Sequence, residues 1–144
     1  MRLSTLATAT LLLAVSASLA SALTRRAEWT GMIMGLGTSK IHGTATMRPG
    51  KEPGTTEVTL STTGDEAGKT RPWHVHIGTC TNATGVLGGP KLYTPVVSDA
   101  KGASKTTVTI AVPMPESGTF SINFHESPTT MATYVACGDF KMGK

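Results

Sequence analysis

Short segments in which apolar and polar residues alternate follow one another along most of this 144-residue chain. Several of them are rich in Thr and Val, and none shows a sustained helical period, so each is expected to be a β-strand. The pattern predicts eight strands, at Trp29–Gly35, Lys40–Met47, Thr55–Thr62, Arg71–Ile77, Thr94–Ser98, Ser104–Val112, Thr119–His125 and Ala132–Gly138.

Turn-forming residues separate the predicted strands. Proline fixes φ and glycine supplies positive φ, which is the chemistry of tight turns. Such turns are expected at Pro49–Gly54, Gly64–Gly68, Asp99–Gly102 and Pro115–Gly118. Eight short strands at this spacing predict an all-β fold, an eight-stranded antiparallel Greek-key barrel or sandwich. The connection Gly78–Tyr93 is too long for a hairpin, and long ordered loops are often functional.

The N-terminal segment has the pattern of a secretory signal peptide. An apolar region at Leu6–Leu19 is followed by the small residues Ala20-Ser21-Ala22, so cleavage is expected after Ala22. A membrane-spanning helix is the alternative, but the apolar run is diluted by Ser and Thr and falls short of the ~20 residues that a span needs. We therefore expect a signal peptide at 1–22, a linker at 23–28 and one domain at 29–144, located in the periplasm or outside the cell, with no stable membrane insertion.

Charge and cysteine content narrow the class of protein further. The formal net charge is +4, and the lysines are scattered, so nothing resembles the basic, aromatic-rich surface of a nucleic-acid binder. Cys80 and Cys137 both follow the signal peptide, and export to an oxidising compartment predicts that they form one disulfide. The alternative, a centre in which cysteine and histidine bind a metal, would need reduced thiols.

The stretch Arg71–Cys80 carries the clearest chemistry in the sequence. His74 and His76 are spaced as His-x-His, and in a strand they project from the same face with roughly 6.5–7 Å between their Cα atoms. Two imidazoles so placed can bind one metal ion at about 2.0–2.1 Å per nitrogen. His125, at the end of another predicted strand, is the natural third ligand. The spacing alone leaves Cu, Zn and Ni open.

Several motifs occur in the same order as in the copper/zinc superoxide dismutases. They are Ile41-His42-Gly43-Thr44, the His74-Val75-His76 strand followed by Gly78 and Cys80, Val97–Ile110 as a strand, turn and strand, Phe124-His125-Glu126, and Val135-Ala136-Cys137-Gly138. The chain thus resembles this family over nearly its whole length after the signal peptide. The resemblance implies an eight-stranded antiparallel Greek-key barrel, copper bound by His74, His76 and His125 with one ion per chain, and a disulfide between Cys80 and Cys137.

The chain also departs from the family in ways that bear on activity. The family's zinc ligands and bridging histidine lie in the loop after the first cysteine, but Thr79–Tyr93 contains no His, Asp or Glu, so no zinc is expected. The family's superoxide-guiding arginine corresponds to Tyr134. The loop before the last strand is short, at Glu126–Thr130, so electrostatic steering of superoxide has no evident source.

Three functions remain open on these grounds. The first is a zinc-free, copper-only superoxide dismutase, the second is a protein that sequesters or delivers copper, and the third is a metal-free structural sandwich.

Further residues have two interpretations each. His42 is expected to have a surface or packing role, with a fourth ligand as the alternative, and Trp73 either shields the metal or packs in the core. Thioethers favour Cu(I), but Met32 and Met34 are expected to face the barrel interior as core residues. Asn82-Ala83-Thr84 fits a glycosylation sequon, which has meaning in a eukaryotic secretory pathway.

Overall fold

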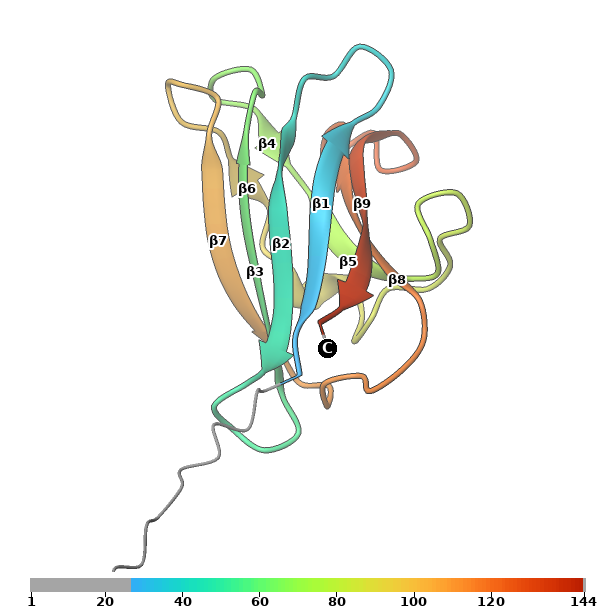
Figure 1. Ribbon diagram of the computed structural model, residues 1–144. Coiled ribbons are helices and arrows are strands. Elements are labelled where there is room, and N and C mark those ends of the chain that lie inside the picture. Colours follow the sequence, from blue (N-terminus) through green and yellow to red (C-terminus); the bar gives the residue numbers. More distant parts are fainter. Residues whose placement is uncertain (1–26, 144) are drawn as a thin grey trace, which may run out of the picture.

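The computed structural model describes residues 27–143, and the predicted signal peptide lies outside them. Seven strands form one antiparallel sheet in the order β5-β8-β9-β1-β2-β3-β7 (Figure 1). Their bounds are β1 Trp29–Gly35, β2 His42–Pro49, β3 Thr56–Thr63, β5 Trp73–Ile77, β7 Ser104–Ile110, β8 Phe120–His125 and β9 Tyr134–Met142. The all-β class and the antiparallel pairing agree with the prediction from the sequence.

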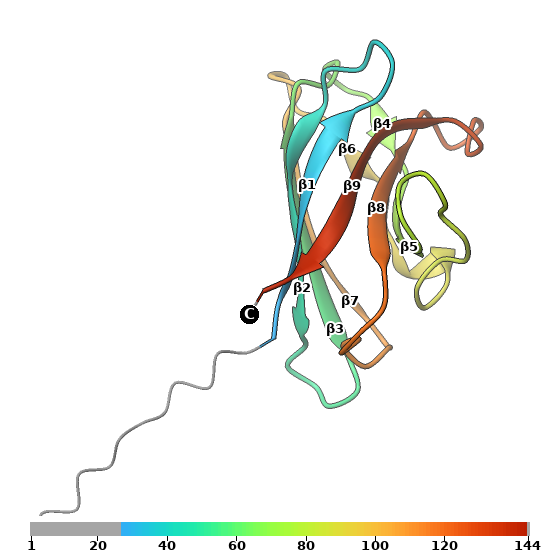
Figure 2. The ribbon, with the colours of Figure 1, turned by 45° about the vertical axis from the view of Figure 1, so that its right-hand side comes forward.

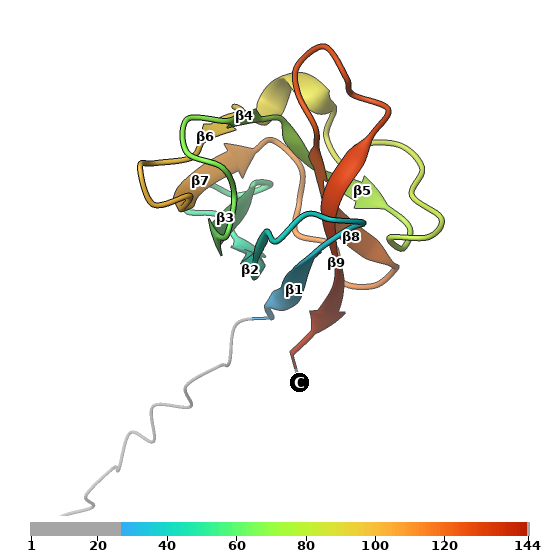
Figure 3. The ribbon, with the colours of Figure 1, turned by 90° about the horizontal axis from the view of Figure 1, so that it is seen from above.

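A second, two-stranded sheet pairs β4 (Thr70–Arg71) with β6 (Val96–Val97). Seen from above, the large sheet curls into a half-barrel, and β4 and β6 lie between its two edges, β5 and β7 (Figure 3). The helical structure of the described residues is limited to one 3₁₀ turn, η1 (Pro90–Leu92). No helix in this part of the chain is long and apolar enough to cross a membrane.

The hydrophobic core fills the concave side of the curled sheet. Every second residue of a strand points inward, so Ile33, Leu60, Val75 and Ile122 from four strands are all fully buried. Figure 2 shows β9, β8 and β5 next to one another in the order in which they pair, and these strands close one side of the core. Burying a side chain of this size is worth about 1.5–3 kcal/mol, so the alternation that predicts the strands also fixes their register.

The segment Arg71–Ile77 does not form the single strand that was predicted. Pro72 interrupts it, so β4 ends at Arg71 and pairs with β6, whereas β5 begins at Trp73 and pairs with β8. Proline has no backbone N–H to donate and cannot continue a ladder on both sides. The break lets the chain leave the small sheet and enter the large one within one residue.

The prediction that Met32 and Met34 face the core was wrong. They are 68% and 58% exposed, while Ile33 between them is fully buried. The strand alternation was correct, but it left open which face is inward. Ile33 belongs to the buried set, so the two methionines project from the convex face.

The two ends of the described chain lie side by side, since the Gly143 amide donates to the Glu28 carbonyl at 2.7 Å. The β1–β2, β3–β4 and β8–β9 loops gather at the opposite end of the molecule (Figure 1).

Candidate metal centre

Strand β5 positions the His-x-His pair on the outer face of the sheet. Trp73 and Val75 alternate with the histidines and enter the core, so His74 and His76 must point the other way. An outward side chain is normally exposed, yet these two are each only 6% exposed. The long connection after β5 covers them.

This covering loop, residues 78–93, runs back along β5 and pairs with the free edge of that strand. The Leu87 amide donates to the Val75 carbonyl and the Ile77 amide donates to the Gly85 carbonyl, at 2.8 and 2.9 Å. The predicted disulfide between Cys80 and Cys137 is present and ties the loop to β9. A long loop that would otherwise move is thus held against the histidines at both its start and its middle.

The third histidine comes from the end of β8. Asn123 faces outward and Phe124 inward, so His125 again lies on the outer face, beside His74 and His76. The register between β8 and β9 shifts at Phe124/His125, and bulges of this kind re-aim side chains near sites. The His125 amide donates to the Pro72 carbonyl at 2.9 Å, which fixes the end of β8 against the start of β5.

The structure therefore brings together the three histidines that the sequence predicts as metal ligands. One ring nitrogen from each lies within 4.8 Å of the others. Among the described residues, these three histidines are the one group of three or more potential metal ligands that lie this close together. Two nitrogens bound to one ion at about 2.0–2.1 Å lie at most about 4.2 Å apart. The cluster is within a fraction of an ångström of that separation.

Hydrogen bonds to backbone carbonyls assign the tautomers of two rings. His76 Nδ1 lies 2.8 Å from the Thr84 carbonyl, and His125 Nδ1 lies 2.5 Å from the Met131 carbonyl. A carbonyl only accepts, so both Nδ1 atoms carry the proton and both Nε2 atoms keep a lone pair. A hydrogen bond from the second ring nitrogen to a backbone carbonyl is the usual way in which proteins orient an imidazole that binds a metal.

The remaining contacts test whether the cluster fits a metal. His74 Nδ1 donates to His125 Nε2 at 2.9 Å, and this shared proton is the one that a metal ion would replace. His76 Nε2 is buried and has no hydrogen-bond partner in residues 27–143. An unpaired buried polar atom costs free energy unless something binds it. The donor set and this orphaned nitrogen fit a bound metal ion.

The electrostatics of the cluster keep the rings of His74 and His125 neutral. Burial lowers the pKa of His74 to about 4, and the neighbouring His125 and His76 add to the shift. Burial also lowers the pKa of His125, against the opposing effect of its bond to Met131. Only a neutral imidazole can donate a lone pair to a metal, so these two rings are in the form that can bind a metal at neutral pH.

Two tyrosine rings, which sequence reasoning did not single out as wall residues, border the cluster. Tyr93 meets His74 edge-on, with 5.6 Å between ring centroids. Tyr134 meets His125 at 5.0 Å and His76 at 5.9 Å. The sequence singles out Tyr134 only through the resemblance to the superoxide dismutases. Its contact with two of the three rings depends on the register shift at Phe124/His125, which leaves no signal in the sequence.

Trp73 and His42 lie apart from the metal cluster. Trp73 is fully buried in the core, where its indole N–H donates to the Thr94 carbonyl, so it packs rather than shields the histidines. His42 is exposed and contacts Lys40 and Thr63. Its surface role agrees with the prediction.

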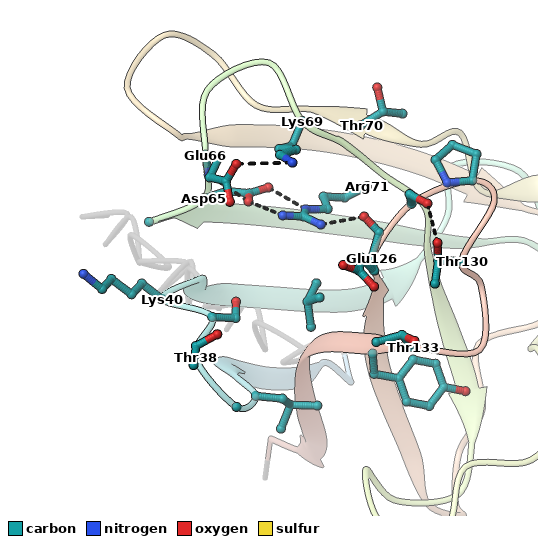
Figure 4. A pocket seen from close by; sticks show the side chains of 18 of the residues that line it. Thr38, Lys40, Asp65, Glu66, Lys69, Thr70, Arg71, Glu126, Thr130 and Thr133 are labelled. Carbon is teal, nitrogen blue, oxygen red and sulfur yellow. Dashed lines mark hydrogen bonds and ion pairs between the residues drawn. The ribbon is translucent and has the colours of Figure 1, made fainter.

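A buried ion pair, which the sequence analysis missed, lies next to the site. Arg71 donates to both carboxylate oxygens of Asp65, at 2.9 and 2.6 Å, and to the Glu126 carbonyl (Figure 4). Ser98 donates to the same carboxylate. Burial alone would raise the pKa of Asp65, but the bonds from Arg71 and Ser98 outweigh it and lower the pKa. The spacing of these residues in sequence gives no hint of their contact.

Fold and site together define a small all-β, disulfide-bonded protein with a buried three-histidine cluster suited to a metal ion. No protein-family model matches the sequence, and no curated protein shows significant similarity to it. The chemistry of the site and the motifs of the chain are therefore the grounds for its function.

Proposed function

We propose that this chain is an exported copper-binding protein of the superoxide dismutase-like family. In this proposal His74, His76 and His125 hold one copper ion per chain, and the strands form the Greek-key barrel of that family. The buried cluster supports the metal, and the order of motifs along the chain supports the family.

One observation carries the proposal: His76 Nε2 is buried, bears a lone pair and has no partner among the described residues, while two further imidazole nitrogens lie within 4.8 Å. A metal-free sandwich would gain stability by replacing that imidazole with an apolar side chain. Retaining it is explained by a ligand role.

The choice of copper rests on the motifs. Three imidazoles suit copper, zinc and nickel alike. The resemblance to the copper ligands of superoxide dismutases, at the same three places in the motif order, favours copper. When bound, copper would supply one-electron chemistry, cycling between its oxidised and reduced states.

Sequestration or delivery of copper is the function that the surroundings of the cluster favour over catalysis. Tyr134 occupies the place of the anion-guiding arginine and its ring covers two of the histidines. Arg71, which donates to the carbonyl of the residue after His125, is already paired with Asp65. A copper-only superoxide dismutase is the second candidate, since all three ligand histidines are present and superoxide would be its substrate.

Export is part of the proposal. The predicted signal peptide lies outside the described residues, and the Cys80–Cys137 disulfide is typical of proteins from oxidising compartments.

A copper titration against a competing chelator tests the proposal. The disulfide-bonded protein is expected to bind one tight equivalent, and the variant His76→Ala is expected to lose it because two imidazoles remain. His42→Ala is the matched control and should bind as the unmodified protein does. Failure of the unmodified protein to compete would reject the proposal in favour of a metal-free sandwich.

A dismutase assay on the copper-loaded protein separates the two copper functions. Tight binding with activity no higher than that of free copper would support sequestration or delivery. Activity well above the free-copper control would instead establish the enzyme.

A further inference from the structure

The histidine cluster is enclosed, so a metal ion or small ligand must displace a side chain to reach it. The three imidazoles are only 4–6% exposed. The covering loop closes one side and the strands β5 and β8 form the floor. The two tyrosine rings complete the wall, and they differ in how firmly they are held.

Tyr93 is a fixed part of this wall. It is 4% exposed, its hydroxyl donates to the Leu87 carbonyl at 2.8 Å, and its ring packs edge-on against Trp73. Moving it would break a buried hydrogen bond and open the core. Burial also raises the pKa of its phenol, so the group stays neutral.

Tyr134 is held much less firmly. It is half-buried, and its hydroxyl forms no hydrogen bond with any residue from 27 to 143. Its ring meets the imidazoles of His76 and His125 edge-on. Rotation of this side chain would therefore break no polar contact, and the phenol would remain accessible to water.

An open pocket of about 910 Å³ lies beside Tyr134. Three loops line it, at 36–40, 64–71 and 126–135, but none of the three histidines does. Figure 4 shows Arg71 crossing the pocket wall between Asp65 and Glu126, with Thr130 and Thr133 nearby. Arg71 is held in this wall by its ion pair with Asp65, whereas Tyr134 both lines the pocket and contacts two of the imidazoles.

We propose that Tyr134 is a gate between this pocket and the histidine cluster, so that metal ions and small ligands reach the three histidines through the pocket. This inference rests on the proposed function, because it assigns the route to the same site. The closed position of the ring shields the bound ion, and its rotation sets the rates of uptake and release.

The gate predicts a kinetic effect without a change in affinity. A gate lowers association and dissociation rates together, because it acts on the path and not on the ligands. Tyr134→Ala is expected to raise both the copper-loading rate and the rate of removal by a chelator, by about tenfold or more, as is usual when binding no longer waits for a conformational change. Their ratio, the dissociation constant, should stay the same.

The measurement is stopped-flow quenching of tryptophan fluorescence by copper, followed by extraction with excess chelator. Tyr134→Phe keeps the ring and should behave as the unmodified protein. Leu36→Ala is the matched control, because Leu36 lines the same pocket and is 43% exposed. It should also leave both rates unchanged.

The outcomes separate the gate from the proposed function. Unchanged rates in Tyr134→Ala, or equal acceleration in Leu36→Ala, would overturn the gate while copper binding stands. Absence of tight binding in the unmodified protein would overturn both. If Tyr134→Ala does not fold, Tyr134→Leu restores apolar volume without the ring and must show the same acceleration.

Discussion

At the scale of single residues, the chemistry of the site depends on three imidazoles that are buried together. Burial disfavours the charged forms of His74 and His125, and the neighbouring rings disfavour them further. Burial keeps the ring nitrogens unprotonated, as metal binding would require. It also makes protonation of these rings unfavourable in the folded state.

The metal-free protein is therefore expected to lose stability as pH falls from 6.5 towards 4. In the unfolded chain His74 takes up a proton near its ordinary pKa of 6.5, whereas in the folded protein it does so only near 4. The unfolded state binds more protons in this window, so its free energy falls relative to the folded state. The contribution of His74 is present above pH 6.5, disappears by about pH 4 and amounts to at most about 3 kcal/mol.

Urea midpoints of the metal-free protein at pH 7, 5.5 and 4.5 measure this effect. His74→Gln should flatten the dependence, while the exposed His42→Gln should retain it. Asp65 contributes in a different window, since the pKa of its carboxyl is lowered and its effect is lost only in stronger acid. A dependence confined to pH below 4 would contradict the assignment to His74.

At the scale of elements, the covering loop is the part that turns a strand with two histidines into an enclosed site. Its first turn requires Gly78, whose φ is 102°. A Cβ on this residue would lie 2.1 Å from the Asn82 carbonyl oxygen. Only glycine at position 78 therefore allows the turn that brings the Thr84 carbonyl of this loop to His76.

Gly78→Ala is expected to destabilise the protein by about 1–3 kcal/mol, the usual cost of an L-residue in such a conformation. Copper affinity should fall as well, because the Thr84 carbonyl would shift relative to His76. The matched control is Gly85→Ala in the same loop, where φ is not positive and nothing lies within 4 Å of the added carbon. Urea unfolding and the chelator titration check both variants, and equal effects would contradict the role of Gly78.

Most strands and the meeting of the three histidines could be predicted from the sequence because each follows from a local rule. Alternation gave the positions of most strands, and the His-x-His spacing placed His74 and His76 on one face. What failed was information that is not local. The inward face of β1 depends on which neighbours cover it, so Met32 and Met34 were misplaced.

The surroundings of the histidine cluster were predicted less well than the cluster itself. The contact of Tyr134 with His125 depends on a bulge between β8 and β9, and the partnership of Arg71 with Asp65 depends on the path of the β3–β4 connection. Neither leaves a periodic signal. Pro72 was the one local cue that was overlooked, since a proline inside a predicted strand argues for a break.

At the scale of the whole molecule, the Arg71 network connects parts of the chain that are far apart in sequence. It joins the β3–β4 connection, the end of β6 and the residue after His125. The side chains of Arg71 and Asp65 are only 9% and 6% exposed. Loss of one partner would leave a buried charge uncompensated.

Arg71→Gln is expected to cost about 3–5 kcal/mol of the free energy of unfolding, as removal of one member of a buried pair does. Arg48→Gln is the control, because Arg48 pairs with Glu28 on the surface with 54% of its side chain exposed. Such a pair is worth about 0–1 kcal/mol. Urea unfolding distinguishes the two, and Asp65→Asn combined with Arg71→Gln should cost less than the sum of the single changes.

The meeting of Glu28 with Gly143 also settles how the protein could be mounted. Both ends of residues 27–143 lie together, away from the three loops that surround the pocket (Figure 1). A fusion partner, a solid support or an electrode attached at either end would leave the pocket mouth facing the solution. Surface-based measurements of the proposed metal uptake can therefore attach the protein near Glu28 or near Gly143.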